Sequence, residues 1–282
     1  MQSIAITMMR KSASGVEQQL GDILCDEIFN TDPNGSTALK TPLPELSTDE
    51  SRDCLLEPIY EYKGFAIKYT VRYREISMAK LAADCGIKVH GYVVRRYEDY
   101  PELGLCRVGL VMEIGRSLAD YIKTITDNEP EKLRVKNEMI SVVERLHTER
   151  RLIHGDIKPS NFLICWDGKI RLCDFEGAKP EDEPAEIWEA LQDDLGITPY
   201  TDRYQSKHRE AYVPPTRNDD WYSLAISVWE LYTGKTAFGS ISTTEELREH
   251  QRSGQTVDLT EVKDIETREW IRKILREGGA LV

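Results

Sequence analysis

The stretch His154-Gly155-Asp156-Ile157-Lys158-Pro159-Ser160-Asn161-Phe162-Leu163 decides the interpretation of this chain, because it places an acid, a lysine and an amide in one short loop. An aspartate such as Asp156 can accept a hydroxyl proton or orient the hydroxyl. Lys158 can neutralise charge on a phosphoryl group, and Asn161 can hold a divalent metal. The apolar run from Phe162 predicts a short strand at the far end of the loop.

Length and composition are those of an ordinary globular protein. The 282 residues suffice for one large domain or two lobes with a substantial core. The apolar fraction of 40% and the charged fraction of 30% are typical of such proteins. The formal net charge of −12 argues against nucleic acid or a membrane as the main partner, since both reward basic patches. An acidic protein is expected to favour basic peptides, and the sequence does not indicate an oligomeric state.

The six cysteines are widely scattered, with no CxxC pair and no close histidine partners. This spacing predicts neither a zinc site nor a disulfide framework, and small buried thiols indicate a reducing compartment. The first residues lack a signal-peptide pattern, and no apolar stretch approaches the length of a membrane span. We therefore expect an intracellular protein, cytoplasmic or nuclear.

The chain divides into a poorly patterned beginning and a well-patterned remainder. Residues 1–55 are rich in turn formers and predict a flexible or poorly structured extension, with a short helix favoured at residues 16–28. Alternating residues at 59–62 and 64–73 predict a hairpin, followed by a helix at 75–84 and strands at 89–95 and 106–112. Helical periodicity then predicts helices at 118–125, 131–150, 220–233, 244–250 and 266–276, with strands at 162–165 and 169–173.

A second motif, Leu172-Cys173-Asp174-Phe175-Glu176-Gly177, follows the loop. The two motifs resemble the catalytic loop and the Asp-Phe-Gly metal-binding motif of the protein kinase family, and Asp-Ile-Lys-Pro-Ser-Asn is similar to its serine/threonine branch. The resemblance implies an α+β fold of two lobes, a small β-rich N-lobe at about 56–112 and a larger helical C-lobe at about 116–276. It also implies ATP and Mg²⁺ as cofactors and a protein as substrate. Gly155 and Glu176 depart from the family, which usually has arginine and glycine there.

The resemblance assigns roles to the residues of both motifs. Asp156 is expected to be the base or the group that orients the hydroxyl, Lys158 to stabilise phosphate charge, and Asn161 and Asp174 to hold the metal. The run from Asn218 to Lys235 resembles the central helix of the larger lobe. Its Asp220 matches a buried aspartate that binds the backbone of the catalytic loop, where His154 is also expected to give structural support.

The nucleotide side of the resemblance rests on two further segments. Gly64-Phe65-Ala66-Ile67-Lys68 resembles the strand whose lysine binds the ATP phosphates, with Glu75 as the partner that orients Lys68. Leu110 to Leu118 resembles the hinge between the lobes. There the backbone of Glu113 and Gly115 would bind adenine, Met112 would guard the back of the pocket, and Ala66 and Leu163 would enclose the base.

The activation segment shows most of the departures. Thr201 to His208 aligns with the end of that segment, so Thr201 is expected to contact Asp156 and Lys158, while Lys207 and His208 replace a Pro-Glu pair. Gly155 removes the arginine that usually receives an activation-loop phosphate, which implies an enzyme that needs no such phosphorylation.

The glycine-rich loop of the family has no counterpart in this sequence. Upstream of Lys68 the glycines are Gly64, Gly35, Gly21 and Gly15, and they form no GxGxxG pattern. A pseudokinase that acts as a binding or scaffolding module is therefore an alternative. A second alternative is a small-molecule kinase similar to the aminoglycoside or choline phosphotransferases, which use His-Gly-Asp. Lys158 and the kinase-like central helix speak against it.

Overall fold

A computed structural model describes residues 29–30, 59–62, 65–69, 73–96, 106–188, 200–209 and 213–281. The chain divides into two compact units, one of residues 1–77 and 88–114 and the other of residues 78–87 and 115–282. Within the predicted extension at residues 1–55, the described part is Phe29–Asn30, which forms a short strand. The helix predicted at residues 16–28 lies outside the described residues.

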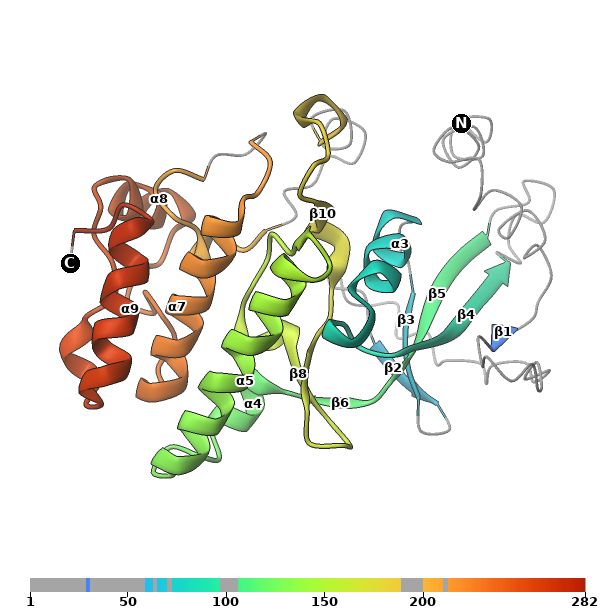
Figure 1. Ribbon diagram of the computed structural model, residues 1–282, viewed down its shortest axis with the longest axis horizontal. Helices are drawn as coiled ribbons and strands as arrows, with labels where there is room; N and C mark the ends of the chain where they lie inside the picture. Colours follow the sequence, from blue (N-terminus) through green and yellow to red (C-terminus); the bar gives the residue numbers. More distant parts are fainter. Residues whose placement is uncertain are drawn as a thin grey trace. The chain divides into compact units, whose positions relative to one another are not determined.

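The first unit contains a five-stranded antiparallel sheet with the strand order β1-β4-β5-β3-β2 (Figure 1). The predicted hairpin is confirmed as β2 paired with β3, and the two later strands as β4 and β5. Ala66 and Lys68 are two apart on β3, so both project from the same face of the sheet. The strands are β1 (Phe29–Asn30), β2 (Ile59–Tyr62), β3 (Phe65–Tyr69), β4 (Val89–Arg96) and β5 (Cys106–Glu113).

Helix α3 (Tyr73–Ala82) follows β3 and ends in the 3-10 turn η1 (Ala83–Cys85). The helix predicted at residues 75–84 is confirmed, with its last residues in the turn. Ile76, Ala79 and Ala82 recur every three residues and are all buried, so the helix forms because it presents one apolar stripe to the interior.

The second unit is built around helix α7 (Arg217–Thr233), which lies between α5 (Glu129–Thr148) and α9 (Ile265–Glu277) (Figure 1). Every residue of α7 from Tyr222 to Leu231 is buried, as expected for a core helix. It starts with a capping box of Thr216 and Asp219 and ends at Gly234, whose φ of 67° suits a residue without Cβ. Two further predicted helices are α4 (Leu118–Ile122) and α8 (Thr244–Arg252).

Short strands hold the loops of the second unit. β6 (Gly115–Ser117), β8 (Phe162–Cys165) and β9 (Ile170–Leu172) form a three-stranded sheet in the order β6-β8-β9. β7 (Leu152–Ile153) pairs with β10 (Lys179–Pro180). The strands β8 and β9 are confirmed predictions, whereas β6, β7 and β10 were not expected. Two or three residues are too few for an alternating pattern to show in a sequence.

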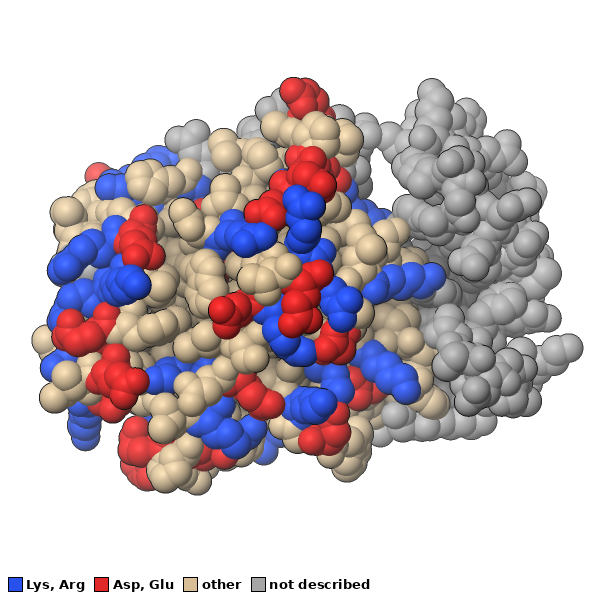
Figure 2. Space-filling view, viewed as in Figure 1, with Lys and Arg blue, Asp and Glu red and all other residues tan. Residues whose placement is uncertain are grey.

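The surface carries both signs of charge. On the face shown in Figure 2, basic and acidic side chains of the described residues are interspersed. Among the helices that the structure describes, none combines the length and the hydrophobicity that a bilayer crossing requires.

Candidate active site

Asp220, in the first turn of α7, fixes the backbone where the catalytic loop (residues 154–161) begins. Its buried carboxylate accepts hydrogen bonds of 2.8 Å from the backbone N–H groups of His154 and Gly155. It accepts a third bond, also 2.8 Å, from Nε2 of His147 on α5. Burial opposes the charged form, but the bonds from His147 and the backbone outweigh it and hold the pKa of Asp220 below its ordinary value. Asp220 therefore joins α5, α7 and the loop as an ionised acceptor.

Asp156 lies at the centre of the loop, and both of its carboxylate oxygens accept hydrogen bonds. Lys158 Nζ donates to Asp156 Oδ2 at 2.6 Å and to Thr201 Oγ1 at 2.8 Å. The backbone N–H of Thr201 donates to Asp156 Oδ1 at 2.9 Å. Asn161 Nδ2 donates to the Asp156 backbone carbonyl at 2.8 Å and to its Oδ2 at 3.2 Å. The structure thus brings these four predicted residues into one hydrogen-bonded network.

His154 connects the loop to the second motif. Its Nδ1 accepts from the Asp156 backbone N–H at 3.3 Å, and its Nε2 lies 3.0 Å from the carbonyl oxygen of Cys173. Both contacts are satisfied together by the tautomer with the proton on Nε2. The ring also packs against Phe175, with ring centroids 5.0 Å apart. A fully buried His154 thereby sets the spacing between Asp156 and the residues that follow Cys173.

Asn161 and Asp174 lie at neighbouring ends of the paired strands β8 and β9. The backbone N–H of Cys173 donates to the Asn161 carbonyl at 2.9 Å, which places Asp174 directly after this contact. Asp174 has a φ of 64°, a left-handed conformation that is uncommon for a residue with a side chain and is often found at functional sites. Because the amide nitrogen of Asn161 donates to Asp156, its Oδ1 is the atom left for a cation. An amide oxygen and a carboxylate match the oxygen ligands that Mg²⁺ prefers.

Gly155 stands where the backbone leaves no room for a side chain. Its φ is 79°, and an added Cβ would lie 2.6 Å from the carbonyl oxygen of Gly177 and 3.1 Å from Cγ of Pro215. An arginine at this position would force the second motif away from the loop. The second motif has its glycine at position 177 instead of 176. The backbone carbonyl of Gly177 occupies the space that a side chain at position 155 would need.

In the first unit, Lys68 Nζ and Glu75 Oε1 form an ion pair of 2.8 Å. The side chain of Glu75 is 4% exposed and that of Lys68 is 20% exposed, so the pair is shielded enough to orient the ammonium group. The strand β5 places Met112 opposite Ala66 on β3. The structure therefore brings Lys68 together with Glu75, and Ala66 together with Met112.

The predicted hinge residues have individual constraints. The backbone N–H of Glu113 donates to the carbonyl of Lys88 at 2.9 Å, so this group is already used within the first unit. In the second unit, a Cβ added to Gly115 would lie 2.7 Å from Cβ of Leu163, because β6 runs directly beside β8. Glycine is thus required where these two strands approach.

Comparison with known proteins agrees with this geometry. A family model described as the protein kinase domain matches residues 65–278. The chain belongs to the protein kinase family. The predicted α+β class and two-lobed kinase fold are thereby confirmed.

Individual relatives are similar over parts of this kinase. Mitogen-activated protein kinase kinase 1 of Arabidopsis thaliana is 30% identical over 51% of the chain and 39% of its own length. A probable serine/threonine-protein kinase of Dictyostelium discoideum is 30% identical over 57% of the chain and 31% of its own length. The human lymphokine-activated killer T-cell-originated protein kinase is 27% identical over 57% of the chain and 52% of its own length. The matched segments thus span less than two thirds of each of these relatives.

Some residues that support the candidate site have no signal in the sequence motifs. His147, which binds Asp220, lies in the last turn of the long helix α5, on the buried stripe of Met139 and Val143. A titratable residue on a buried helix face needs a polar partner, and this signal could have pointed to it. Arg217 donates from one guanidinium nitrogen to Glu181 Oε2 and to the His147 carbonyl, each at 2.7 Å. No local motif marks this contact, because its members lie in three distant segments.

The end of the activation segment is packed without the Pro-Glu pair of the family. Lys207 and His208 lie against Gly279, where an added Cβ would be 2.4 Å from Cε of Lys207 and 2.6 Å from Nε2 of His208. The next residue, Arg209, is 1% exposed and lies over the ring of Tyr200 at 5.0 Å. Within the described part of the chain, none of its three guanidinium nitrogens has a hydrogen-bond partner.

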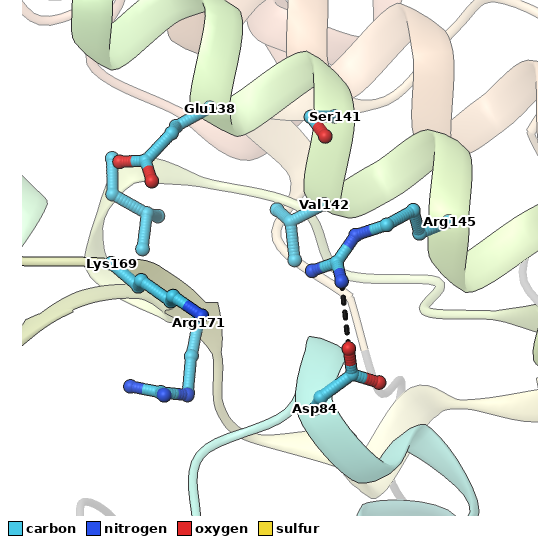
Figure 3. Close-up of a pocket in the computed structure, with 8 residues that line it drawn as sticks. Asp84, Glu138, Ser141, Val142, Arg145, Lys169 and Arg171 are labelled. Carbon is cyan, nitrogen blue, oxygen red and sulfur yellow. Dashed lines mark hydrogen bonds and ion pairs between the residues drawn. The ribbon is translucent and has the colours of Figure 1, made fainter. Parts of the chain in front are cut away.

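A polar hollow on the second unit lies apart from these residues (Figure 3). Asp84 of η1 accepts hydrogen bonds from Arg145 at 2.7 Å and Arg150 at 2.6 Å, and the bond from Arg150 lowers the pKa of its carboxyl. The hollow thus marks where η1 is anchored to α5. It is lined by Asp84, Glu138, Ser141, Val142, Arg145, Lys169, Ile170 and Arg171.

Proposed function

We propose that this chain is an active protein kinase that transfers the γ-phosphoryl group of ATP to serine or threonine hydroxyls. The observation that carries the proposal is the network of Asp156, Lys158 and Thr201, in which one ammonium group bridges a carboxylate and a hydroxyl at 2.6 and 2.8 Å. A phosphoryl-transfer site needs an oriented acceptor for the hydroxyl proton beside a positive charge. The network supplies both in one arrangement.

The proposed chemistry follows from these positions. The substrate hydroxyl oxygen attacks the γ-phosphorus, its proton passes to the carboxylate of Asp156, and the bond to the β,γ-bridging oxygen breaks to release ADP. Lys158 offsets the negative charge on the transferred group. The three residues that donate to Asp156 (Lys158, Asn161 and Thr201) fix its orientation, which supplies the positioning on which this class of reaction depends.

The nucleotide would be bound by residues of both motifs and of β3. We assign Lys68, oriented by Glu75, to the phosphates, and Asn161 and Asp174 to Mg²⁺. Mg²⁺ held by Asn161 and Asp174 would neutralise negative charge on the phosphates. For adenine we assign the backbone carbonyl of Glu113, since its N–H already donates to Lys88, and the backbone of Gly115, with the apolar residues Ala66, Met112 and Leu163 around the base.

The finer assignments concern specificity and regulation. The contact between Thr201 and Lys158 supports the serine/threonine branch. The lack of space at Gly155 supports activity without activation-loop phosphorylation, because no arginine can stand there to receive the phosphate. The net charge of −12 makes basic peptides the first protein substrates to try. Cys85, Cys165 and Cys173 are free thiols, which supports the proposed reducing compartment.

A pseudokinase is the second candidate, favoured by the absence of a GxGxxG pattern before Lys68. Thermal unfolding with and without Mg²⁺-ATP distinguishes the two, since a ligand that binds the native state raises Tm. The wild type is expected to gain several degrees from Mg²⁺-ATP. Asp174→Ala should lose the Mg²⁺-dependent part, while the exposed control Asp120→Ala keeps it. A wild type that does not respond to Mg²⁺-ATP contradicts the enzyme proposal.

Transfer itself is measured with radiolabelled ATP on basic peptides and on small alcohols. The wild type is expected to label serine or threonine peptides. Asp156→Asn should keep the Mg²⁺-ATP shift but lose labelling about 100-fold or more, the contribution typical of a positioned general base. Labelling of small alcohols alone would instead favour the small-molecule kinase.

A further inference from the structure

The residues that follow the second motif form backbone hydrogen bonds with residues 151–153, directly before the catalytic loop. Strand β10 pairs with β7, which ends directly before His154. One residue beyond β10, the backbone N–H of Glu181 donates to the carbonyl of Arg151 at 2.9 Å. These backbone contacts thus place Glu181 beside the strand that leads into the loop.

The carboxylate of Glu181 meets Arg217 at the start of α7. Arg217 Nη2 donates to Glu181 Oε2 at 2.7 Å and, from the same nitrogen, to the backbone carbonyl of His147 at 2.7 Å. Arg151 adds a looser contact, with Nε 3.6 Å from Glu181 Oε2. The guanidinium group of Arg217 therefore joins Glu181, in the activation segment, to the end of α5.

The contact continues to the catalytic loop. His147, whose carbonyl accepts from Arg217, uses its Nε2 to bind Asp220, and Asp220 holds the N–H groups of His154 and Gly155. Each link from Glu181 to Gly155 is a hydrogen bond of 2.7 or 2.8 Å. This series of hydrogen bonds restrains the backbone at Gly155, the position where the family usually has an arginine.

We propose that Glu181 and Arg217 are positioning residues for phosphoryl transfer, and that the carboxylate of Glu181 supplies the fixed negative charge that holds residues 179–181, at the start of the activation segment, in place. In kinases that are switched by phosphorylation, such a charge is added as a phosphate that pairs with arginine. Here it is part of the sequence. This inference rests on the proposed function, since it explains how the same site stays aligned without that modification.

The test compares Glu181→Gln, which keeps the shape and removes the charge, with Asp182→Asn as a matched control. The control residue is the next acid along the chain, with a side chain 72% exposed and 3.8 Å from Arg151. Glu181→Gln and Arg217→Met are each expected to lower kcat about three- to tenfold, with KM for ATP unchanged within about twofold. The double variant is expected to be no slower than Arg217→Met alone, because the pair acts as a unit.

Two kinetic results would overturn the proposal. One is a kcat of Glu181→Gln within twofold of that of Asp182→Asn. The other is a double variant whose loss equals the product of the single losses. Melting temperatures within about 2 °C of wild type are expected for all variants, because the side chains of Arg217 and Glu181 are 36% and 34% exposed. A lower kcat would then not be caused by a loss of folded protein.

A second measurement separates this proposal from the proposed function. Hydrogen exchange at the amides of His154 and Gly155 needs no turnover. It is expected to be faster in Glu181→Gln than in Asp182→Asn. If the wild type labels no substrate but this difference appears, the proposed function fails and the positioning contact stands. Equal exchange in both variants rejects the contact even in an active enzyme.

Discussion

The catalytic loop and the end of the activation segment, residues 200–209, differ in how completely their buried polar groups are bonded. In the loop, Asp156, Asn161 and His154 all have hydrogen-bond partners at 2.6 to 3.3 Å. In the segment, the guanidinium of Arg209 and Oε1 of Gln205 are buried without a partner among the described residues. The catalytic loop is thus fully bonded at these three side chains, with Asp220 fixing its backbone, whereas the segment holds two buried polar side chains that lack partners.

Gly155→Ala changes the catalytic loop, the better-bonded of the two regions, and should lower the free energy of unfolding more than the other substitutions. Alanine at a φ of 79° costs about 1–2 kcal/mol. The approach of its Cβ to the Gly177 carbonyl adds to this, so we expect about 3 kcal/mol less free energy of unfolding by chemical denaturation.

The matched control is Gly168→Ala. Gly168 has a similar φ of 76°, but nothing lies within 4 Å of an added Cβ. It should therefore lose about 1 kcal/mol, the conformational part alone. Equal losses at the two positions would contradict the close contact between Gly155 and Gly177.

Arg209→Met should improve the poorly bonded region. An unpaired buried charge is destabilising, and burial already lowers the pKa of this guanidinium. The lost contact with the Tyr200 ring offsets part of the gain, which leaves an increase of about 1 kcal/mol in the free energy of unfolding. The control is Arg171→Met, which removes two hydrogen bonds to Asp167 and should be neutral or slightly destabilising. A loss at Arg209 larger than at Arg171 would show that Arg209 has an anionic partner.

Glu230→Gln, which removes the carboxylate that Tyr204 of the segment donates to, should have the smallest effect, and this effect is on the pH dependence of stability. Burial raises the pKa of Glu230 above 4.5, although the Ala237 N–H and the Tyr204 hydroxyl both donate to it. The folded state therefore binds the proton more tightly than the unfolded state, and wild-type stability falls as pH rises through the window that begins near 4.5. Glutamine removes this fall, so Tm measured from pH 4 to pH 7 should decline less in the variant. Glu149→Gln, at an exposed position, should follow the wild type.

Local patterns in the sequence predicted the long elements and left the long-range contacts open. The stripe of Ile76, Ala79 and Ala82 and the alternation in β2 and β3 carry their own period, so α3 and the hairpin could be anticipated. The contact of Arg217 with Glu181 joins segments 36 residues apart and has no local signature. Gly155 could be recognised as a departure from the family, but its reason lies in the backbone of Gly177, which only the folded chain brings near.

The amide of Asn161 has a consequence for how this position can vary. Its Nδ2 donates to the backbone carbonyl and to Oδ2 of Asp156, which leaves its Oδ1 for the proposed metal. An aspartate would be the stronger cation ligand, but it would turn a lone pair toward the oxygens of Asp156 and repel them. Only a side chain that donates at one end and accepts at the other serves both neighbours. The position is therefore closed to the substitution that simple ligand chemistry would favour most.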